Sequence, residues 1–364
     1  MTTGLSGRFF LPGPTEVHPD VLQAMIQPMI AHRGQMMVDL LERTDRPLRE
    51  LFCTDRPVLI GTCAATGFME LAVRSGVRHR ALCLVSGAFG ERFAGIAEAT
   101  GRDVVRLNVP PGQTIEPDML EDALERSNGV DAVTAVHSET STGALAPIAE
   151  LAEVVQRFDD VLFLVDGVTS VAGSPVRSDE WGLDFVFTGS QKALALPPGL
   201  ALGVASERMV ERARTIPERG AYLDLVAFHE AAANYQPTNT PAVSLLYALA
   251  VQLDRISASG GIQARWDRHE QMLQTIEGWV AGKGGDLGFG YLPREQRRSW
   301  TISCLEVPGR CNGREVARAV AGEGWTIGSG YGSLKEQTIR IGHMGDHSAD
   351  RLRELLEVIE SVIG

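Results

Sequence analysis

The stretch that decides the fold follows an apolar, strand-like run and reads Phe187-Thr188-Gly189-Ser190-Gln191-Lys192-Ala193-Leu194-Ala195-Leu196-Pro197-Pro198-Gly199. One strand–connection–strand unit earlier, Asp166 ends another apolar run. A lysine amine on a loop can form a Schiff base with a cofactor aldehyde, and a carboxylate can pair with a protonated ring nitrogen. Lys192 and Asp166 are therefore the pair of groups that pyridoxal 5'-phosphate (PLP) requires. The alternative is a solvated surface lysine, since most lysines are exposed.

The chain as a whole resembles the class V (fold type I) PLP-dependent aminotransferases of the alanine–glyoxylate and serine–pyruvate kind. The resemblance begins at Leu11-Pro12-Gly13-Pro14-Thr15 and ends at Thr338-Ile339-Arg340-Ile341-Gly342-His343-Met344-Gly345. The stretch around Lys192 is its most specific part. It implies an α/β fold with a mostly parallel seven-stranded sheet, helices on both faces and a smaller C-terminal α+β domain.

The pattern of apolar residues agrees with this fold. Strand-like runs alternate with helix-like stretches between about residues 57 and 205, which indicates βαβ units. The runs are 57–61, 81–85, 104–109, 132–137, 161–166, 183–188 and 202–205. From about residue 245 a long helical region continues to Trp279, and a final helix is predicted with Ser348 as its N-cap. We expect a large domain over 1–249 and a small one over 250–364, which the first dozen residues can join.

The composition describes an ordinary soluble protein of 364 residues, of which 44% are hydrophobic and 22% charged. A net charge of −12 disfavours nucleic acid and anionic membranes as partners, because both need a basic footprint. The five cysteines lack metal-type spacing, and no metal site is expected. No signal peptide is evident in residues 1–8, and no apolar run is long enough to span a bilayer. A reducing cytoplasm fits these features best.

The candidate phosphate site is the stretch Cys63–Glu70, which lies between a predicted strand and a predicted helix. A helix N-terminus binds anions through free N–H groups and the helix dipole. By resemblance the cofactor-binding residues are Ala65, Thr66 and Gly67, with Gln191 beside the lysine also near the phosphate. Ala64 and Ala65 replace a Ser-Gly pair that is usual in the family, so one hydroxyl is missing. A plain helix cap is the alternative.

Four further residues gain roles from the resemblance. Phe89 matches an aromatic that stacks on the cofactor ring, although an ordinary core phenylalanine is the alternative. Thr140 matches a contact to the ring oxygen and to the substrate carboxylate, or else it belongs to a simple Ser/Thr turn. Arg340 is the candidate clamp for the substrate carboxylate, which a guanidinium can bind with two parallel hydrogen bonds. Its alternative is a solvent-facing arginine on an edge strand, while Gly13 would approach the same carboxylate through its backbone.

The segment Asn234–Pro241 resembles a loop that reaches the phosphate of the neighbouring subunit. Asn239 and Thr240 are its expected contacts, which implies a homodimer with composite active sites. His32 and Arg33 also match a family position, but the sequence gives them no role. Tyr331 stands where class V cysteine desulfurases carry their nucleophilic cysteine.

The resemblance favours transfer of an amino group from a small amino acid, alanine or serine, to a small 2-oxo acid, glyoxylate or pyruvate, by a ping-pong mechanism. A PLP-dependent lyase or an aminoethylphosphonate-type transaminase of the same fold is the alternative. A non-catalytic relative would be expected to lack Lys192 or Asp166, and both are present.

Overall fold

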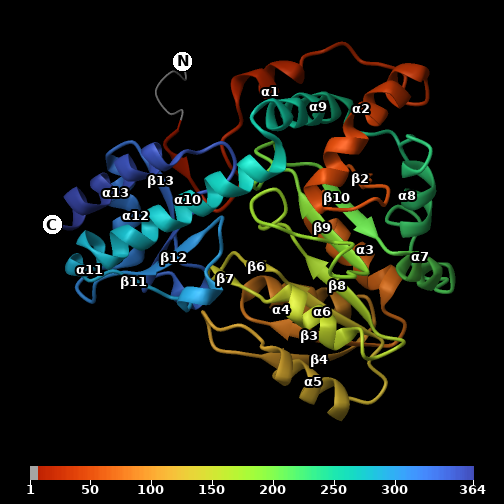
Figure 1. Ribbon diagram of the computed structural model, residues 1–364, viewed down its shortest axis with the longest axis horizontal. Coiled ribbons are helices and arrows are strands. Elements are labelled where there is room, and N and C mark those ends of the chain that lie inside the picture. The colour runs from red at the N-terminus through yellow and green to blue at the C-terminus, as the bar shows by residue number, and fades with distance from the viewer. Residues whose placement is uncertain (1–6) are drawn as a thin grey trace.

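The computed structural model describes residues 7–364, and its central feature is a seven-stranded sheet (Figure 1). The strands lie in the order β2-β10-β9-β8-β5-β3-β4. Their bounds are β2 (Leu59–Gly61), β3 (Arg80–Val85), β4 (Asp103–Asn108), β5 (Ala132–Val136), β8 (Leu162–Asp166), β9 (Phe185–Gly189) and β10 (Ala201–Ala205). β10 is the antiparallel member, and the other strands run parallel, which confirms the predicted sheet. The expectation about a signal peptide concerns residues that lie mostly outside the described range.

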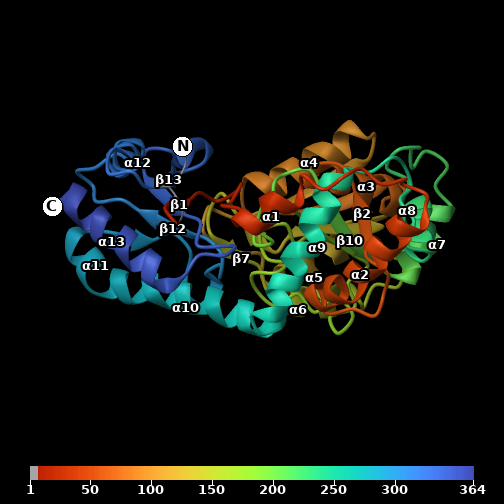
Figure 2. The same cartoon turned by 90° about the horizontal axis from the view of Figure 1, so that it is seen from above.

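Helices cover both faces of this sheet, and the central strands β5, β8 and β9 are therefore buried on both sides (Figure 2). In β3, Leu82 and Leu84 join one hydrophobic core, and the alternating Ala81, Cys83 and Val85 join the other. One face carries α3 (Ala65–Gly76), α4 (Ala88–Ala99), α7 (Glu207–Arg214) and α8 (Leu225–Ala232). The other carries α2 (Gln35–Phe52), α5 (Pro117–Arg126), α6 (Ile148–Val155) and α9 (Val243–Ala258), with α1 (Pro19–Ala24) packed on α9.

A second, five-stranded sheet lies beside the first and has a hydrophobic core of its own. Its strand order is β1-β13-β14-β12-β11. The bounds are β1 (Phe9–Phe10), β11 (Gly290–Tyr291), β12 (Ser303–Glu306), β13 (Thr326–Ser329) and β14 (Thr338–Ile341). The helices are α10 (Gly261–Ala281), α11 (Lys283–Leu287), α12 (Gly313–Gly322) and α13 (Ala349–Ile363), with short 3-10 turns at Glu295–Arg297 and Gly332–Leu334. β1 pairs with β13, so the start of the chain belongs to this smaller sheet.

Two details differ from or refine the sequence prediction. The expected continuous helix up to Trp279 is divided into α9 and α10 at Ser259-Gly260, where Gly260 has φ +98°, a conformation that glycine adopts readily. Ser348 accepts a hydrogen bond from the Arg351 N–H, which confirms the predicted N-cap of α13. The proposed domain boundary at residue 249 falls inside α9 and stays a prediction. No described helix has the length and apolar character that crossing a membrane requires.

The topology brings six strand ends to one edge of the large sheet. β2, β3, β4, β5, β8 and β9 all run in the same direction, so the loops that follow them lie along that edge. In open α/β sheets this carboxyl edge is where ligands bind. The short hairpin of β6 (Ser138–Glu139) and β7 (Ala144–Leu145) follows β5 at the same edge.

Candidate active site

Lys192 lies on the loop after β9 and is only 7% exposed. Its Nζ donates a hydrogen bond to the carbonyl oxygen of Pro12. A Cβ added to Gly13 would lie 2.7 Å from Cδ of Lys192, so the Pro12–Gly13 turn packs directly against the lysine. Burial lowers the pKa of Lys192 to about 8, which makes the neutral, nucleophilic amine accessible near neutral pH. The alternative of a solvated surface lysine is wrong.

Asp166 ends β8, the strand next to β9, and is 3% exposed. Its Oδ1 accepts a hydrogen bond from the Val168 N–H at 2.8 Å. Burial raises the pKa of Asp166 to about 7, and the nearby charge of Lys192 opposes this shift without forming an ion pair. A buried carboxylate with one hydrogen bond has room for a cationic N–H partner, which would return its pKa toward the usual range.

Thr140 follows β6 and contacts residues of both sheets. Its hydroxyl lies 2.6 Å from the hydroxyl of Thr169, which belongs to the loop after Asp166. Its carbonyl oxygen accepts a hydrogen bond from Nη1 of Arg340 at 3.1 Å. Thr140 is buried, so these contacts fix the turn after β6 between the loop that follows Asp166 and the β14 arginine.

Arg340 occupies β14, which lies between β13 and β12, so the alternative of an edge-strand arginine is wrong. Nε donates to the carbonyl oxygen of Ser329 at 3.0 Å, and the guanidinium lies 5.4 Å from the ring centroid of Tyr331. Within the described part of the chain Nη2 has no hydrogen-bond partner, so it remains available for a ligand. This arrangement suits a carboxylate clamp.

Phe89 is half-buried at the first turn of α4, after β3. Its ring centroid lies 5.9 Å from that of Tyr331, and the Arg92 guanidinium lies 4.7 Å from the Phe89 centroid. Phe89 is absent from both hydrophobic cores of the large sheet, so the alternative of an ordinary core phenylalanine is not supported. Phe89 thus lies at the carboxyl edge of the sheet, the edge at which Asp166 ends β8.

The N-terminus of α3 is open. The N-cap residue Ala64 makes no side-chain bond, no side chain in residues 7–364 accepts from the Ala65 or Thr66 N–H, and Thr66 is exposed. A Cβ added to Gly189 would lie 2.6 Å from Oε1 of Gln191 and 3.0 Å from Cβ of Ala65. Two of the predicted phosphate contacts, Gln191 and Ala65, therefore both lie beside Gly189. The alternative of an ordinary capped helix does not describe α3. Free N–H groups of Ala65 and Thr66 remain for an anion.

Asn239 and Thr240 are exposed on the connection between α8 and α9. No contact within the described chain joins them to Lys192, and their role at a second subunit stays a prediction. His32 is half-buried and Arg33 is exposed. The structure adds no role for either residue.

Glu139 and Arg92 have no predicted function from the sequence, and the structure places both near Lys192 and Asp166. Arg92 gave no signal beyond its position three residues after Phe89. Glu139 stands in the stretch Ser138–Gly143 directly after a buried strand, where a carboxylate needs partners. That context was visible in the sequence.

Comparison with known proteins assigns the family. The profile of aminotransferase class V matches residues 89–344, which is more than half of the chain. The chain belongs to the class V aminotransferase family. It is 36% identical to an uncharacterized aminotransferase of Methanocaldococcus jannaschii over 92% of this chain and 87% of that protein. It is 29% identical to the L-aspartate–glyoxylate aminotransferase of Paracoccus denitrificans over 92% and 86%.

A solved structure confirms the fold of this aminotransferase. The alanine–glyoxylate aminotransferase of a Nostoc species superposes with a TM-score of 0.92 and 28% identity, over 100% of this chain and 97% of the other. The predicted resemblance and the α/β fold are thereby confirmed. The cofactor of the family is PLP, as the sequence predicted.

The residues of this chain fit PLP in three places. Lys192 offers a buried amine of lowered pKa. Asp166 offers a buried carboxylate with room for a cationic donor. The first turn of α3 offers N–H groups without a side-chain cap to a phosphate. An aldehyde, a basic ring nitrogen and an anionic group match these three features, and PLP has all three.

Proposed function

We propose that this aminotransferase moves the amino group of a small amino acid, alanine or serine, onto a small 2-oxo acid, glyoxylate or pyruvate, by a ping-pong mechanism. The observation that best supports the proposal is the hydrogen bond from Arg340 to Thr140, because Thr140 also contacts Thr169 on the loop after Asp166, and a guanidinium at this position can bind a carboxylate. Two of the similar proteins above, an alanine and an aspartate aminotransferase, use glyoxylate. Aspartate is therefore a further donor to test.

When bound, PLP supplies an aldehyde that takes up the amino group and a ring that withdraws electrons from the substrate Cα. Lys192 Nζ would then move the proton of the substrate Cα, a task that its lowered pKa suits. Asp166 would hold a proton on the ring nitrogen through an ionic hydrogen bond, which keeps the ring electron-withdrawing. These two residues carry the chemical step in our proposal.

The other residues of the site bind and orient. Ala65, Thr66, Gly67 and Gln191 would hold the cofactor phosphate, and Phe89 would cover one face of the ring and exclude water from it. Arg340 would bind the substrate carboxylate through Nη1 and Nη2, and Thr140 and the Gly13 backbone would complete that site. Orientation by several fixed contacts of this kind is a large source of rate enhancement.

We also propose that Asn239 and Thr240 contact the phosphate in a second subunit, which makes the active unit a homodimer. Exposure of both residues supports this, since within residues 7–364 the only side-chain hydrogen bond that either makes is a long one from Asn239 to the adjacent Thr238. A cytoplasmic location is supported by the five free cysteines.

A donor–acceptor screen tests the proposal. The PLP-loaded protein would be given alanine, serine or aspartate with glyoxylate or pyruvate, and the new amino acid and 2-oxo acid would be measured. We expect product only when donor and acceptor are both present over many turnovers. Release of ammonia and pyruvate from serine without any acceptor would contradict the proposal and support the lyase alternative.

A further inference from the structure

Glu139 is a buried carboxylate for which the proposed chemistry has no use. It ends β6 and is 0% exposed, and no ion pair in residues 7–364 involves it. Its Oε2 accepts hydrogen bonds from the N–H groups of Phe89 and Gly90, both at 3.1 Å. Its Oε1 accepts from the N–H of Ser141 at 3.0 Å and from the Ser141 hydroxyl. Burial of a charge is costly, so four donors around one carboxylate indicate a built arrangement.

These bonds close the N-terminus of α4. The Ser141 hydroxyl also accepts from the Ala88 N–H at 3.0 Å, so the first three N–H groups of the helix are all satisfied by the turn after β5. A Cβ on Gly87 would lie 2.5 Å from Cγ of Glu139, which shows how closely the helix start approaches this side chain. The negative charge also complements the helix dipole. The neighbouring helix α3 lacks such a cap and remains open to an anion.

The position of Glu139 connects two groups of the site that come from different parts of the chain. On one side it holds the backbone of Phe89, the aromatic that faces the cofactor site. On the other it is bonded through the peptide to Thr140, whose carbonyl oxygen receives Arg340. A shift of the carboxylate would therefore move the aromatic and the carboxylate clamp relative to each other.

We propose that Glu139 is a positioning residue of the aminotransferase site, which sets the Phe89 ring and the Thr140–Arg340 clamp in register. This inference rests on the proposed function of Phe89 and Arg340. The plain alternative is that Glu139 only caps α4 and contributes to stability, as many helix caps do.

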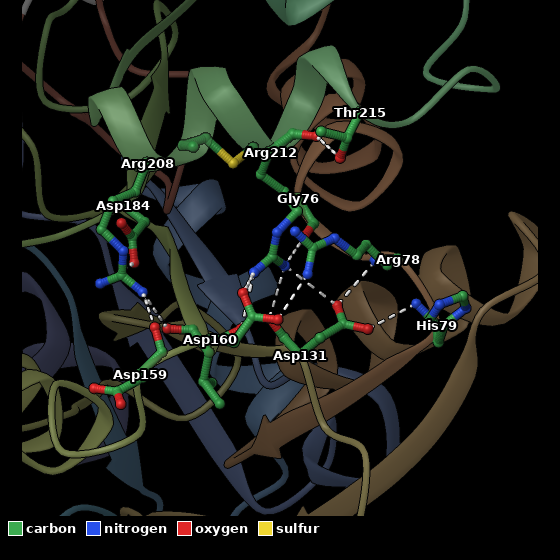
Figure 3. Close-up of polar contacts among 12 residues, drawn as sticks. Gly76, Arg78, His79, Asp131, Asp159, Asp160, Asp184, Arg208, Arg212 and Thr215 are labelled. Atoms are coloured by element: carbon green, nitrogen blue, oxygen red, sulfur yellow. Dashed lines mark hydrogen bonds and ion pairs between the residues drawn. The ribbon is translucent and has the colours of Figure 1, made fainter.

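The chain contains a matched control at the other end of β5, the strand that precedes β6. Asp131 precedes β5, is 7% exposed, and accepts hydrogen bonds from the N–H groups of Arg78 and His79 at 2.9 and 2.7 Å (Figure 3). It also accepts from the Arg80 N–H at 3.2 Å. It is also a buried carboxylate that ties down backbone N–H groups. It differs in having Arg212 at 3.6 Å and in lying at the far edge from Lys192.

The test compares Glu139→Gln with Asp131→Asn in the full-length protein. Each change replaces one accepting oxygen by an NH₂ group that cannot accept, so both should lower the Tm of the cofactor-free protein. We expect only Glu139→Gln to reduce the visible circular dichroism per bound PLP, because that signal reports the asymmetric setting of the ring. It should also lower kcat/KM for the amino donor about tenfold, mainly through KM.

Each outcome decides the proposal. If both variants lower Tm but neither changes the dichroism or KM, Glu139 is only a helix cap and the proposal is wrong. If Glu139→Gln does not fold, Ser141→Ala replaces it, since it removes one bond of Glu139 and the cap on Ala88. It should give the same two changes at smaller size, and their absence would overturn the proposal. A wild type that takes up no PLP would instead overturn the proposed function, and this inference with it.

Discussion

The buried ionisable groups at the two ends of the parallel strands differ in whether they form ion pairs. At the edge where the parallel strands begin, Arg212 lies 2.7 Å from Asp160 and 3.6 Å from Asp131, and Arg78 also pairs with Asp160 (Figure 3). At the edge where they end, Asp166 has no ion-pair partner within the described residues, and Lys192 donates to a backbone carbonyl. Both edges contain ionisable groups, but only at the first edge are these charges paired with each other. The first is called the closed edge below and the second the open edge.

This difference separates stability from function. Ion pairs within the protein connect strands and loops, and their hydrogen-bonding atoms are no longer available to a ligand. Unpaired buried groups cost stability and shift their pKa, and such groups cluster at active sites. Burial raises the pKa of Asp166 to about 7 and lowers that of Lys192 to about 8, as expected for buried groups without an ion-pair partner.

Lys192→Ala should produce the largest effect at the open edge. Loss of proton transfer by Lys192 should by itself lower kcat roughly 10²- to 10⁴-fold. PLP can remain bound through the α3 N-terminus and Asp166, so its uptake is measured separately by absorbance. Turnover close to wild type would show that another group acts as the base.

Asp166→Asn should follow, with kcat lower by roughly 10²- to 10³-fold, because the ring nitrogen loses its ionic partner. The fold should be kept, since the amide can still accept from the Val168 N–H. Steady-state kinetics with saturating donor measures the effect. A variant with wild-type turnover would mean that Asp166 is a structural carboxylate at a strand end.

The same residue should also contribute to the pH dependence of stability in the cofactor-free protein. Its pKa is raised from 3.8 to about 7, so the folded chain retains a proton that the unfolded chain releases. The contribution of Asp166 to stability should therefore fall as pH rises from about 4 to about 7, by up to a few kcal/mol, while buried histidines such as His137 and His347, whose pKa burial lowers, act in the opposite direction. Urea unfolding at several pH values within this window isolates this contribution as the difference in unfolding free energy between the wild type and Asp166→Asn, which should decline as pH rises. Parallel curves for both proteins would contradict the assigned shift.

Arg340 should affect substrate binding more narrowly. Arg340→Ala should lower kcat/KM for amino acids by about 10²-fold, and Arg340→Lys by less, because lysine keeps the charge but loses the planar fork. A primary amine without a carboxylate should react equally poorly with all three proteins. If amines and amino acids suffer alike, or if PLP is lost, Arg340 has a structural role.

Arg212→Met tests the closed edge, where the charges are paired, and should have the smallest effect on catalysis. Arg212 is 4% exposed and donates to the carbonyl oxygens of Gly76, Asp131 and Asp160. Its removal should cost roughly 3 kcal/mol of unfolding free energy, measured in urea. Below the unfolding transition, kcat/KM should stay within about twofold of wild type. A large loss of activity without a loss of stability would contradict the division between the two edges.

Much of this could be read from the sequence because the signals were local. The seven strand-like runs, the N-cap Ser348 and the stretch around Lys192 depend on residues next to one another. The break at Gly260 was missed because the apolar pattern continues across it, and its left-handed φ is a property of one peptide unit. The role of Glu139 depends on its contacts with Phe89 and Gly90, fifty and forty-nine residues away, which no local pattern reveals.

The central claim is that Lys192 binds the cofactor covalently, and the chain allows a direct measurement. Its full sequence contains only three lysines, Lys192, Lys283 and Lys335. Borohydride reduction of the PLP-loaded protein, followed by peptide mapping, should place the adduct on the peptide that contains Lys192. Lys283 is 75% exposed at its side chain and Lys335 is also exposed, so they control for random modification. A stoichiometric adduct on either of them, with Lys192 unmodified, would contradict the account.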